Sequence, residues 1–315
     1  MVRKIALVGI GKIACDQHVP AIAASPDWHL AATVSRRGTV DSVDAYTALA
    51  DMLTARPDIE VVSLCLPPVP RFDAAAAALA AGRHVMLEKP PGATLAECHT
   101  LAAIARAQGV SLYATWHSRE AARVADAKAW LARRRLTRLT ITWKEDVRRW
   151  HPGQAWIWEP GGLGVFDPGI NALSILTEIL PDPLHLTNAT LEVPDNCQAP
   201  IAAALDFHHP HGATVTAVFD WRQEGDQIWT IEAETDRGRL CLYDGGARMT
   251  VDGQSFGSAQ GDTALAGEYP RLYANMARLV DAGGIDMDLA PMCLVADAFL
   301  LGRRVAVAPF SEAQP

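Results

Sequence analysis

Short apolar runs alternate with helix-like segments over about the first 115 residues of the chain. The runs at 4–8, 30–34, 61–66, 84–87 and 111–114 are typical of buried strands. Two helix-like segments end near residue 24 and at residue 55. Two more span 72–81 and 94–108, and Gly82 and Gly109 end them. Strands and helices that alternate in this way predict a doubly wound parallel sheet of the Rossmann type.

After residue 117 the apolar positions recur every second residue, which is typical of half-buried strands. In the run 139–145 one face carries Leu139, Ile141, Trp143 and also Glu145, and a carboxylate on an apolar face is unusual. Further strands are expected at 186–193, 202–207, 214–221, 228–235 and 239–243, and helices at 121–132, 268–282 and 291–302. We therefore expect an α/β protein with a Rossmann domain over 1–120. An α+β domain with a large, mostly antiparallel open sheet is expected over 121–315.

Composition excludes several classes of partner. The 315 residues are 50% hydrophobic and carry a formal net charge of −8, which offers nucleic acid or an anionic membrane little to bind. No apolar run reaches membrane-spanning length, and the first one lacks a cleavage site, so we expect a cytoplasmic protein. Six scattered cysteines without a pairing pattern suit a reducing compartment and indicate no metal site. The expected partner is a small molecule, and a homodimer is compatible with the sequence.

A glycine-rich fingerprint follows the first strand. Gly9 permits a tight turn, Gly11 allows the backbone to approach a pyrophosphate, and Ala14 keeps the next helix close to the strand. The pattern is weak alone, but here it follows a strand and opens a helix, which is its confirming context. It predicts a dinucleotide held at the helix amino end.

The second strand ends in Ser35, Arg36 and Arg37, where an NAD-specific site presents an acidic side chain to the ribose 2′-hydroxyl. A hydroxyl and guanidinium groups suit a 2′-phosphate instead, so NADP is the preferred cofactor and NAD the second. A basic turn without a ligand is the alternative. The residues expected to contact the cofactor are Gly9, Gly11, Lys12, Ile13, Ser35, Arg36, Arg37, Cys65, Pro67, Glu88 and Lys89.

Lys89 stands directly after the apolar run 84–87 and before two prolines. It therefore lies at the carboxyl end of a predicted parallel strand, where open α/β sheets bind their ligands. An ordinary solvated strand exit is the alternative, and the glycine fingerprint upstream argues against it.

The loop 150–162 holds three of the nine tryptophans. Tryptophans beside polar side chains suit a sugar, because its C–H faces stack on indole while its hydroxyls need donors and acceptors. For Trp150 and Trp158, core packing and sugar contact are equally compatible with the sequence.

Asp167 and Asn171 are four residues apart at the start of a predicted helix, so both project from one side of its first turn. Asp167 before Pro168 predicts an N-cap followed by the first helical residue. A cap is compatible with a catalytic role, since the helix dipole keeps the carboxylate ionised. The later residues Tyr269 and Tyr273 lie on an amphipathic helix and are expected to pack in a core or an interface.

The fingerprint, the Glu88-Lys89-Pro90 sequence and the Gly161-Gly162 loop leading to Asp167 resemble the glucose-fructose oxidoreductase and inositol dehydrogenase family. Within it, the stretches 143–158 and 164–173 resemble bacterial L-arabinose and D-galactose 1-dehydrogenases. The resemblance implies oxidation of C1 of an aldopyranose to the lactone with NAD(P)+.

The resemblance also assigns roles. It makes Lys89 the catalytic lysine and Asp167 its acidic partner, and it implies sugar contacts from His117, Glu145, Trp150 and Trp229. Many family members carry histidine where this chain has Asn171, which cannot take a proton, so Asn171 orients the substrate and the base is Lys89 or Asp167. A non-catalytic NAD(P)-binding sensor and a reductase of another carbonyl substrate stay open as alternative functions.

Overall fold

The computed structural model describes residues 2–257 and 267–312 and divides the chain into two compact units. The first unit comprises Met1–His117 and Tyr269–Asp288, and the second comprises Ser118–Glu268 and Leu289–Pro315. The expected division at residue 120 placed the whole carboxyl-terminal part in the second domain, and the segment 269–288 departs from it. Helix α8 (Glu268–Ala282) packs its apolar face on the first sheet, against Ile5, Leu7 and Met86.

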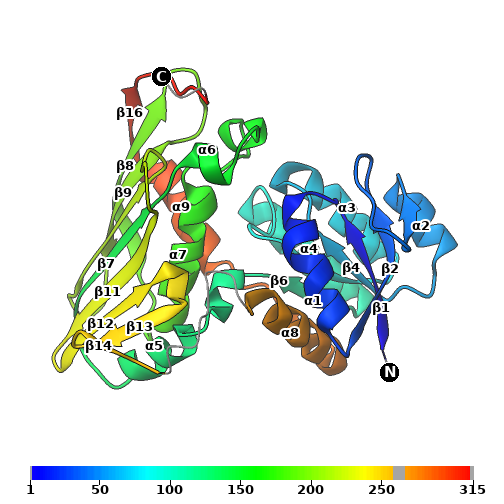
Figure 1. The fold of residues 1–315 in the computed structure, drawn as a ribbon, viewed down its shortest axis with the longest axis horizontal. Helices are drawn as coiled ribbons and strands as arrows, with labels where there is room; N and C mark the ends of the chain where they lie inside the picture. Colours follow the sequence, from blue (N-terminus) through cyan, green and yellow to red (C-terminus); the bar gives the residue numbers. More distant parts are fainter. Residues whose placement is uncertain (1, 258–266, 313–315) are drawn as a thin grey trace. The chain divides into compact units, whose positions relative to one another are not determined.

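The first unit is built on a parallel sheet (Figure 1). In the described residues its strands lie in the order β15-β6-β5-β4-β1-β2-β3. Their bounds are β1 Arg3–Val8, β2 Trp28–Val34, β3 Asp44–Tyr46, β4 Val61–Leu64, β5 His84–Leu87, β6 Leu112–Ala114 and β15 Ile285–Asp286. Strand β15 joins from beyond residue 280, and the sequence did not predict it, because two residues carry no periodicity. The expected doubly wound parallel sheet is confirmed.

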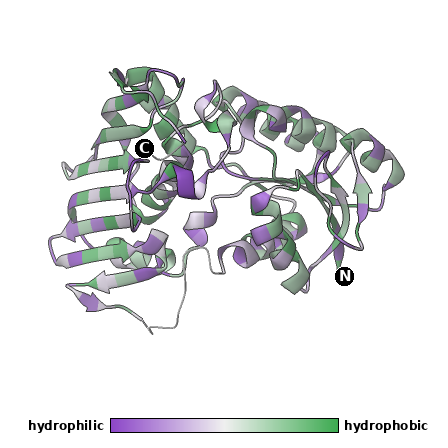
Figure 2. Ribbon diagram, turned by 45° about the horizontal axis from the view of Figure 1, so that its top comes forward, coloured by the Kyte–Doolittle hydropathy of each residue, from purple (hydrophilic) through white to green (hydrophobic). Residues whose placement is uncertain are grey.

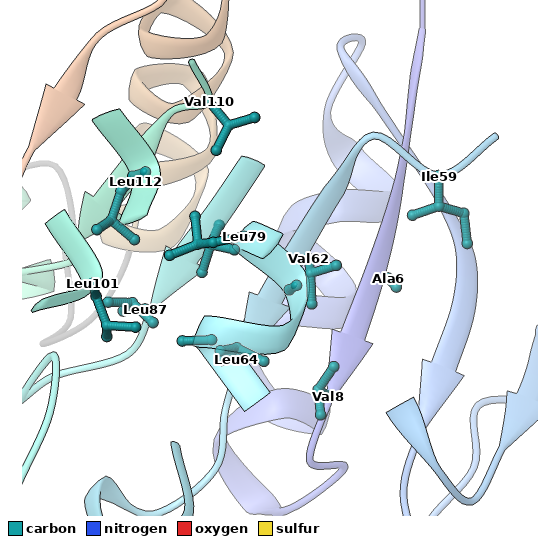
Figure 3. Close-up of a cluster of buried hydrophobic side chains, with 14 of the residues drawn as sticks. Ala6, Val8, Ile59, Val62, Leu64, Leu79, Leu87, Leu101, Val110 and Leu112 are labelled. Carbon is teal, nitrogen blue, oxygen red and sulfur yellow. The ribbon is translucent and has the colours of Figure 1, made fainter. Parts of the chain in front are cut away.

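Helices cover both faces of this sheet. One face packs on α3 (Pro68–Ala80) and α4 (Leu95–Gln108), where Val8, Val62, Leu64, Leu79 and Leu101 form the buried cluster of Figure 3. The predicted start of α3 at residue 72 was wrong, because prolines are tolerated in the first turn of a helix, where their missing N–H groups cost no bond. The smaller α2 spans Leu49–Ala55.

The first helix is irregular where it follows the glycine turn. It contains a π-helical turn, Ala14–His18, before α1 (Val19–Ala24) begins. Pro20 lies at the start of α1 and has no N–H for the bond to the preceding turn. The wider turn therefore places His18 on the buried side of the helix, and its side chain is 1% exposed.

The second unit contains a large mixed sheet. Over the described residues its order is β14-β13-β12-β11-β7-β10-β9-β8-β16, with parallel pairs only at β7–β10 and β8–β16. The bounds are β7 Leu136–Lys144, β8 His185–Pro194, β9 Ala202–His208, β10 Thr214–Asp220, β11 Ile228–Thr235, β12 Gly238–Tyr243, β13 Arg248–Val251, β14 Gln254–Ser255 and β16 Arg303–Val307. Figure 2 shows hydrophilic and hydrophobic residues alternating along these strands, as the sequence predicted.

Helices α7 (Phe166–Ile179), α9 (Ala290–Leu301) and α5 (Val124–Leu131) pack beside this sheet. Short helical turns complete the unit: α6 (Val147–Trp150) and the 3₁₀ turns Ala155–Trp158 and Asp244–Gly246. The 3₁₀ turn His117–Glu120 begins at the last residue of the first unit's main segment. Among the residues described, no helix combines the length and apolar character needed to cross a membrane.

Candidate active site

The strand register of the first unit aligns the predicted cofactor residues along one sheet edge. Val8 pairs with Val34 and with Leu64, and Leu64 pairs with Leu87. The residues that follow these strand ends therefore form a row, which is Gly9, Ser35, Cys65 and Glu88. This is the carboxyl edge, where doubly wound sheets bind ligands.

The glycine loop has the geometry that a pyrophosphate requires. Gly9 has φ +89°, and a Cβ there would lie 3.0 Å from Leu66 Cδ2 and 3.2 Å from the Cys65 carbonyl oxygen, so only glycine fits. A Cβ on Gly11 would meet no atom within 4 Å. The backbone at Gly11 therefore borders open space at the beginning of the helix, which fits a dinucleotide phosphate.

Three further predicted cofactor residues border this loop. Lys12 and Ile13 open the first helix, and the Lys12 ammonium pairs with Asp16 one turn later on the exposed side. Pro67 caps the amino end of α3 directly after the β4 loop. Their backbones lie in the expected region, while the Lys12 side chain is engaged on the helix surface.

The turn after β2 is ordered by Ser35. Its Oγ accepts hydrogen bonds from the backbone N–H groups of Arg37 (3.3 Å) and Gly38 (3.1 Å). A Cβ on Gly38 would lie 2.6 Å from the carbonyl oxygen of Ile10, so this turn packs against the glycine loop. Arg36 and Arg37 are exposed. Two guanidinium groups therefore stand near the loop on a turn without an acidic side chain.

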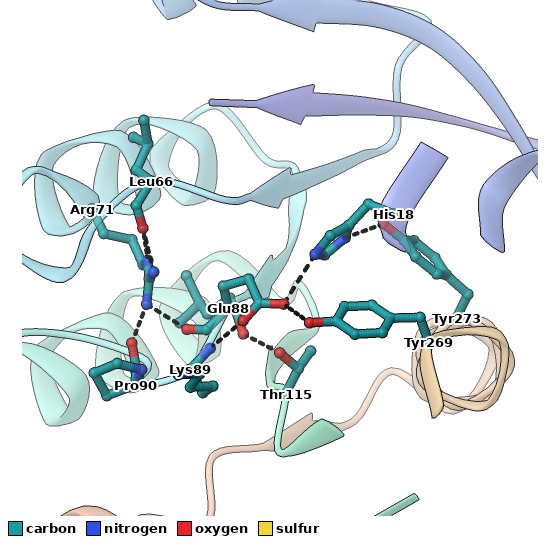
Figure 4. Close-up of polar contacts among 10 residues, drawn as sticks. His18, Leu66, Arg71, Glu88, Lys89, Pro90, Thr115, Tyr269 and Tyr273 are labelled. Carbon is teal, nitrogen blue, oxygen red and sulfur yellow. Dashed lines mark hydrogen bonds and ion pairs between the residues drawn. The ribbon is translucent and has the colours of Figure 1, made fainter. Parts of the chain in front are cut away.

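The main chain around Lys89 is held by buried charged groups (Figure 4). The Arg71 guanidinium, 2% exposed, donates to the carbonyl oxygens of Glu88 and Pro90 and to that of Leu66. The Lys89 N–H donates to Glu88 Oε2 at 2.9 Å, and the Lys89–Pro90 peptide bond is cis. Arg71 and Glu88 thus fix the backbone on both sides of Lys89.

The Glu88 carboxylate bonds within the protein. Its Oε1 accepts from Tyr269 Oη (2.8 Å) and lies 3.0 Å from His18 Nε2, and His18 Nδ1 lies 2.7 Å from Tyr273 Oη. Sequence reasoning missed His18 and expected only packing from the two tyrosines. A histidine just after the fingerprint and tyrosines four residues apart were the available signals. Glu88 was predicted as a cofactor contact; its side chain points to His18 in the π-helical turn and to Tyr269 in α8.

Electrostatics favour the charged form of both partners of this pair. Burial alone lowers the pKa of His18, but Cys65, Tyr273 and Glu88 outweigh it and hold the pKa well above its ordinary value. Burial alone raises the pKa of Glu88, but the hydrogen bond and charge of His18, with the charges of His117 and Lys89, hold it well below its ordinary range. The result is a buried imidazolium–carboxylate pair directly before Lys89.

His117, a predicted sugar contact, lies in the same unit. Its ring stacks on Tyr269 with centroids 5.6 Å apart and planes 18° apart, and the residue is buried. Tyr269 therefore contacts His117 with its ring and Glu88 with its hydroxyl.

Glu145 organises the candidate sugar-binding residues of the second unit. Its side chain is buried on the apolar face, as the alternation indicated, and accepts hydrogen bonds from Trp229 Nε1 (2.8 Å) and Trp221 Nε1 (3.3 Å). The Trp150 ring packs on Trp229 at 5.2 Å. Three predicted residues, Glu145, Trp150 and Trp229, are thus brought together.

His151 joins them and was not predicted as a site residue. Its Nε2 lies 3.7 Å from Glu145 Oε1 and 3.7 Å from Asp167 Oδ2, and its ring contacts Trp221 at 5.3 Å. The signal was its position beside Trp150 in the tryptophan-rich loop. In the structure His151 directly follows α6 as its C-cap, and its N–H donates to the carbonyl oxygen of Val147. A histidine between two buried carboxylates completes a cluster of donors and acceptors.

Asp167 is buried in this cluster, but the prediction that it caps the helix was wrong. Helix α7 begins at Phe166 with Val165 as N-cap, so Asp167 is already the second helical residue. Its N–H donates to the Gly164 carbonyl oxygen at 2.8 Å, so the chain is already helical there. Pro168 remains within the first turn, where its missing N–H costs no bond.

Trp158 and Asn171 lie less centrally. The Trp158 ring packs on Trp221 (5.1 Å) and on Phe310 (4.8 Å), which is the packing alternative. Asn171 lies one turn after Asp167 on α7, and its side chain is partly buried. The described residues contain no group of three His, Cys, Asp or Glu side chains that could hold a metal ion.

Known proteins share this architecture. Residues 3–115 match a family described as an oxidoreductase family with an NAD-binding Rossmann fold. The chain is 43% identical to galactose 1-dehydrogenase from Pseudomonas fluorescens, over 98% of this chain and 99% of that protein. The crystal structure of D-galactose-1-dehydrogenase from Rhizobium etli is 52% identical, covers 98% of each chain and has a TM-score of 0.93.

A more distant likeness concerns the fold alone. A 3-ketoreductase from Actinomadura kijaniata, solved with NADP and TDP-benzene, is 18% identical with a TM-score of 0.84 over 98% of this chain and 100% of that chain. The match over 3–115 and the full-length identity agree with the fingerprint and with the Glu88-Lys89-Pro90 sequence at the strand ends. The chain therefore belongs to the glucose-fructose oxidoreductase and inositol dehydrogenase family of NAD-binding Rossmann-fold oxidoreductases.

Proposed function

We propose that the chain is an NAD(P)-dependent aldose 1-dehydrogenase that oxidises C1 of D-galactose, and also of L-arabinose, to the lactone. The observation that carries this proposal is the buried Glu145 carboxylate, which two indole N–H groups hold in place. A carboxylate offers about four lone-pair sites, so acceptor capacity remains for sugar hydroxyls. The full-length similarity to two galactose 1-dehydrogenases supports the same reaction class.

The side chains around Glu145 suit a pyranose. Trp229 and Trp150 offer indole surface for the C–H face of the ring, and His151 and Asp167 offer polar atoms for its hydroxyls. His117 is proposed as a further sugar contact, with Asn171 holding a hydroxyl that it cannot deprotonate. Trp158 has a supporting role, because its ring is engaged by Trp221 and Phe310.

The bound nicotinamide supplies the acceptor for the hydride that leaves C1. Lys89 takes the proton of the C1 hydroxyl as general base, and Asp167 acts as its acidic partner. The rigid backbone at Lys89, held by Arg71 and Glu88, supports this assignment, because a general base must be positioned accurately. Lys89→Ala should lower kcat on the order of 10²-fold with cofactor affinity little changed.

NADP+ is proposed as the preferred cofactor. Arg36 and Arg37 are exposed on a turn that Ser35 orders and that packs against the glycine loop. No carboxylate in this turn repels a 2′-phosphate, whereas guanidinium groups bind phosphate oxygens in a fork.

A panel of pyranoses, assayed with NAD+ and NADP+ by the absorbance of the reduced nicotinamide, tests the function. D-Galactose and L-arabinose share the arrangement of their ring hydroxyls and differ in the CH2OH at C5. D-Glucose inverts the C4 hydroxyl and leaves a buried polar partner unpaired, at about 1–3 kcal/mol. Equal kcat/KM for glucose and galactose contradicts this hydroxyl recognition.

The same panel separates the alternatives. A sensor binds cofactor and reduces none of it with any pyranose. A reductase of another carbonyl oxidises NADPH with a carbonyl substrate and leaves the pyranoses unchanged. Either result overturns the proposed dehydrogenase.

A further inference from the structure

A chain of buried polar groups connects two helices with the backbone of Lys89 (Figure 4). Tyr273 of α8 bonds His18, His18 bonds Glu88, and Glu88 accepts the N–H of Lys89, at 2.7, 3.0 and 2.9 Å. Tyr269 of α8 donates to the same carboxylate at 2.8 Å. The four residues Tyr273, His18, Tyr269 and Glu88 are each at most 5% exposed.

Stability alone is a poor reason for such a pair. Desolvation of two charges opposes their attraction, and apolar side chains of similar volume often stabilise a core equally well. His18 moreover reaches Glu88 from the π-helical turn Ala14–His18. Such turns are rare in proteins, and those that occur are often found at functional sites. The pair is therefore a candidate for a role beyond filling the interior.

The Glu88 carboxylate is anchored on both sides. Oε2 holds the Lys89 N–H, while Oε1 receives the Tyr269 hydroxyl, whose ring stacks on His117 at 5.6 Å. Arg71 holds the carbonyl oxygens that flank Lys89. One buried carboxylate thus links the backbone of the proposed base to the ring that supports a proposed sugar contact.

We propose that His18, Glu88 and Tyr269 are positioning residues, which fix Lys89 relative to His117 for the oxidation at C1. This proposal rests on the proposed role of Lys89. Its physical basis is that misplacement of a reacting group by about 1 Å can cost on the order of 10²-fold in rate. The imidazolium holds Glu88 ionised and oriented, and Tyr269 transmits that orientation to His117.

The Tyr269→Phe enzyme tests the link, because it lacks the hydroxyl and keeps the ring on His117. We expect kcat with galactose to fall about tenfold, while KM and the dissociation constant of NADP+ change less than about twofold. Tyr273→Phe, one bond further from Lys89, should give a smaller fall. The matched control is Tyr113→Phe, which removes a hydroxyl from another buried tyrosine of the same unit, bonded to Asn275 at 3.3 Å. It should keep wild-type kcat.

Introducing Tyr269→Phe into the Lys89→Ala enzyme shows whether the Tyr269 hydroxyl acts through Lys89. We expect Tyr269→Phe to lower the residual rate of that enzyme no further. The same fold loss in both backgrounds overturns the proposal, because the hydroxyl then acts independently of Lys89. Wild-type kcat in Tyr269→Phe overturns it as well.

A substrate-free measurement separates this proposal from the proposed function. The rate of Lys89 acetylation by acetic anhydride, followed by peptide mass spectrometry, should change severalfold in Tyr269→Phe and stay unchanged in Tyr113→Phe. An unchanged rate in Tyr269→Phe overturns the positioning role. A changed rate in a chain that oxidises no aldose supports the positioning of Lys89 and overturns only the dehydrogenase assignment.

Discussion

If His18 and Glu88 form a buried ion pair, substituting one partner should lower the free energy of unfolding more than substituting both. His18→Leu leaves the Glu88 carboxylate buried without its counter-charge, and breaking a buried ion pair from one side costs about 3–5 kcal/mol. Glu88 keeps the Tyr269 hydroxyl at 2.8 Å and the Lys89 N–H at 2.9 Å, so the lower end, about 3 kcal/mol, is expected. At roughly 2–4 °C per kcal/mol for a domain of this size, Tm should fall by about 6–12 °C.

Adding Glu88→Gln to the His18→Leu variant should restore part of the lost stability. Glu88→Gln removes the stranded charge; its one amide oxygen can accept the Lys89 N–H while its NH2 donates to the Tyr269 hydroxyl oxygen. His18→Leu with Glu88→Gln should therefore be more stable than His18→Leu alone. Thermal unfolding followed by circular dichroism measures all four proteins. A double variant that is less stable than His18→Leu would refute the ion-pair interpretation.

The pair also has a defined pH window. The raised pKa of His18 gives stability that is present below about 6.5, the unfolded value, and is lost as the pH rises through the folded pKa. The lowered pKa of Glu88 gives stability that is present above about 4.5 and is lost as the pH falls through the folded pKa. Cys65, Tyr273, Tyr269, His117 and Lys89 face the pair. The Tm difference between wild type and His18→Leu should therefore be largest between about pH 4.5 and 6.5 and should shrink at alkaline pH.

Three further changes have expected outcomes. Gly164→Ala places a Cβ 2.3 Å from the Pro200 carbonyl oxygen at φ +53° and should lower the free energy of unfolding, measured by thermal unfolding, by about 2–4 kcal/mol. The control Gly212→Ala, with φ +77° and no atom within 4 Å of the new Cβ, should lower it by about 1 kcal/mol. Glu145→Gln places an amide NH2 against one of the two indole N–H donors and removes the charge, and should lower kcat/KM for galactose by about 10- to 150-fold; an unchanged value removes Glu145 from the site. Arg36→Asp should reverse the preference for NADP+, and wild-type kcat/KM for NAD+ more than about tenfold above NADP+ contradicts our interpretation of that turn.

Local signals in the sequence were sufficient for most elements. Helix α4 begins after Thr94, whose Oγ1 accepts the Glu97 N–H at 3.2 Å, and ends at Gly109 with φ +66°. Strand β5 has the predicted bounds, and the period-two alternation places Glu145 on the buried face. These features depend on residues within one or two turns of each other, so periodicity, caps and glycine stops predict them.

Tertiary structure decided the partners of the polar side chains. His18 and Glu88 are 70 positions apart, and Tyr269 is 181 positions from Glu88, so no local pattern indicates that they share one carboxylate. Tertiary structure also decided where α7 begins. The sequence Asp167-Pro168 favours Asp167 as N-cap, but the helix begins at Phe166.

The sequence by itself determined most of the strands and helices and that Lys89 follows the end of a strand, because backbone preferences and apolar periods act locally. Only the folded chain decided that α8 belongs to the first unit, that His151 stands between Glu145 and Asp167, and which buried charges pair. The physical reason is that desolvation and pairing energies depend on which groups long-range packing brings within hydrogen-bond distance, and the linear order of residues does not encode that distance.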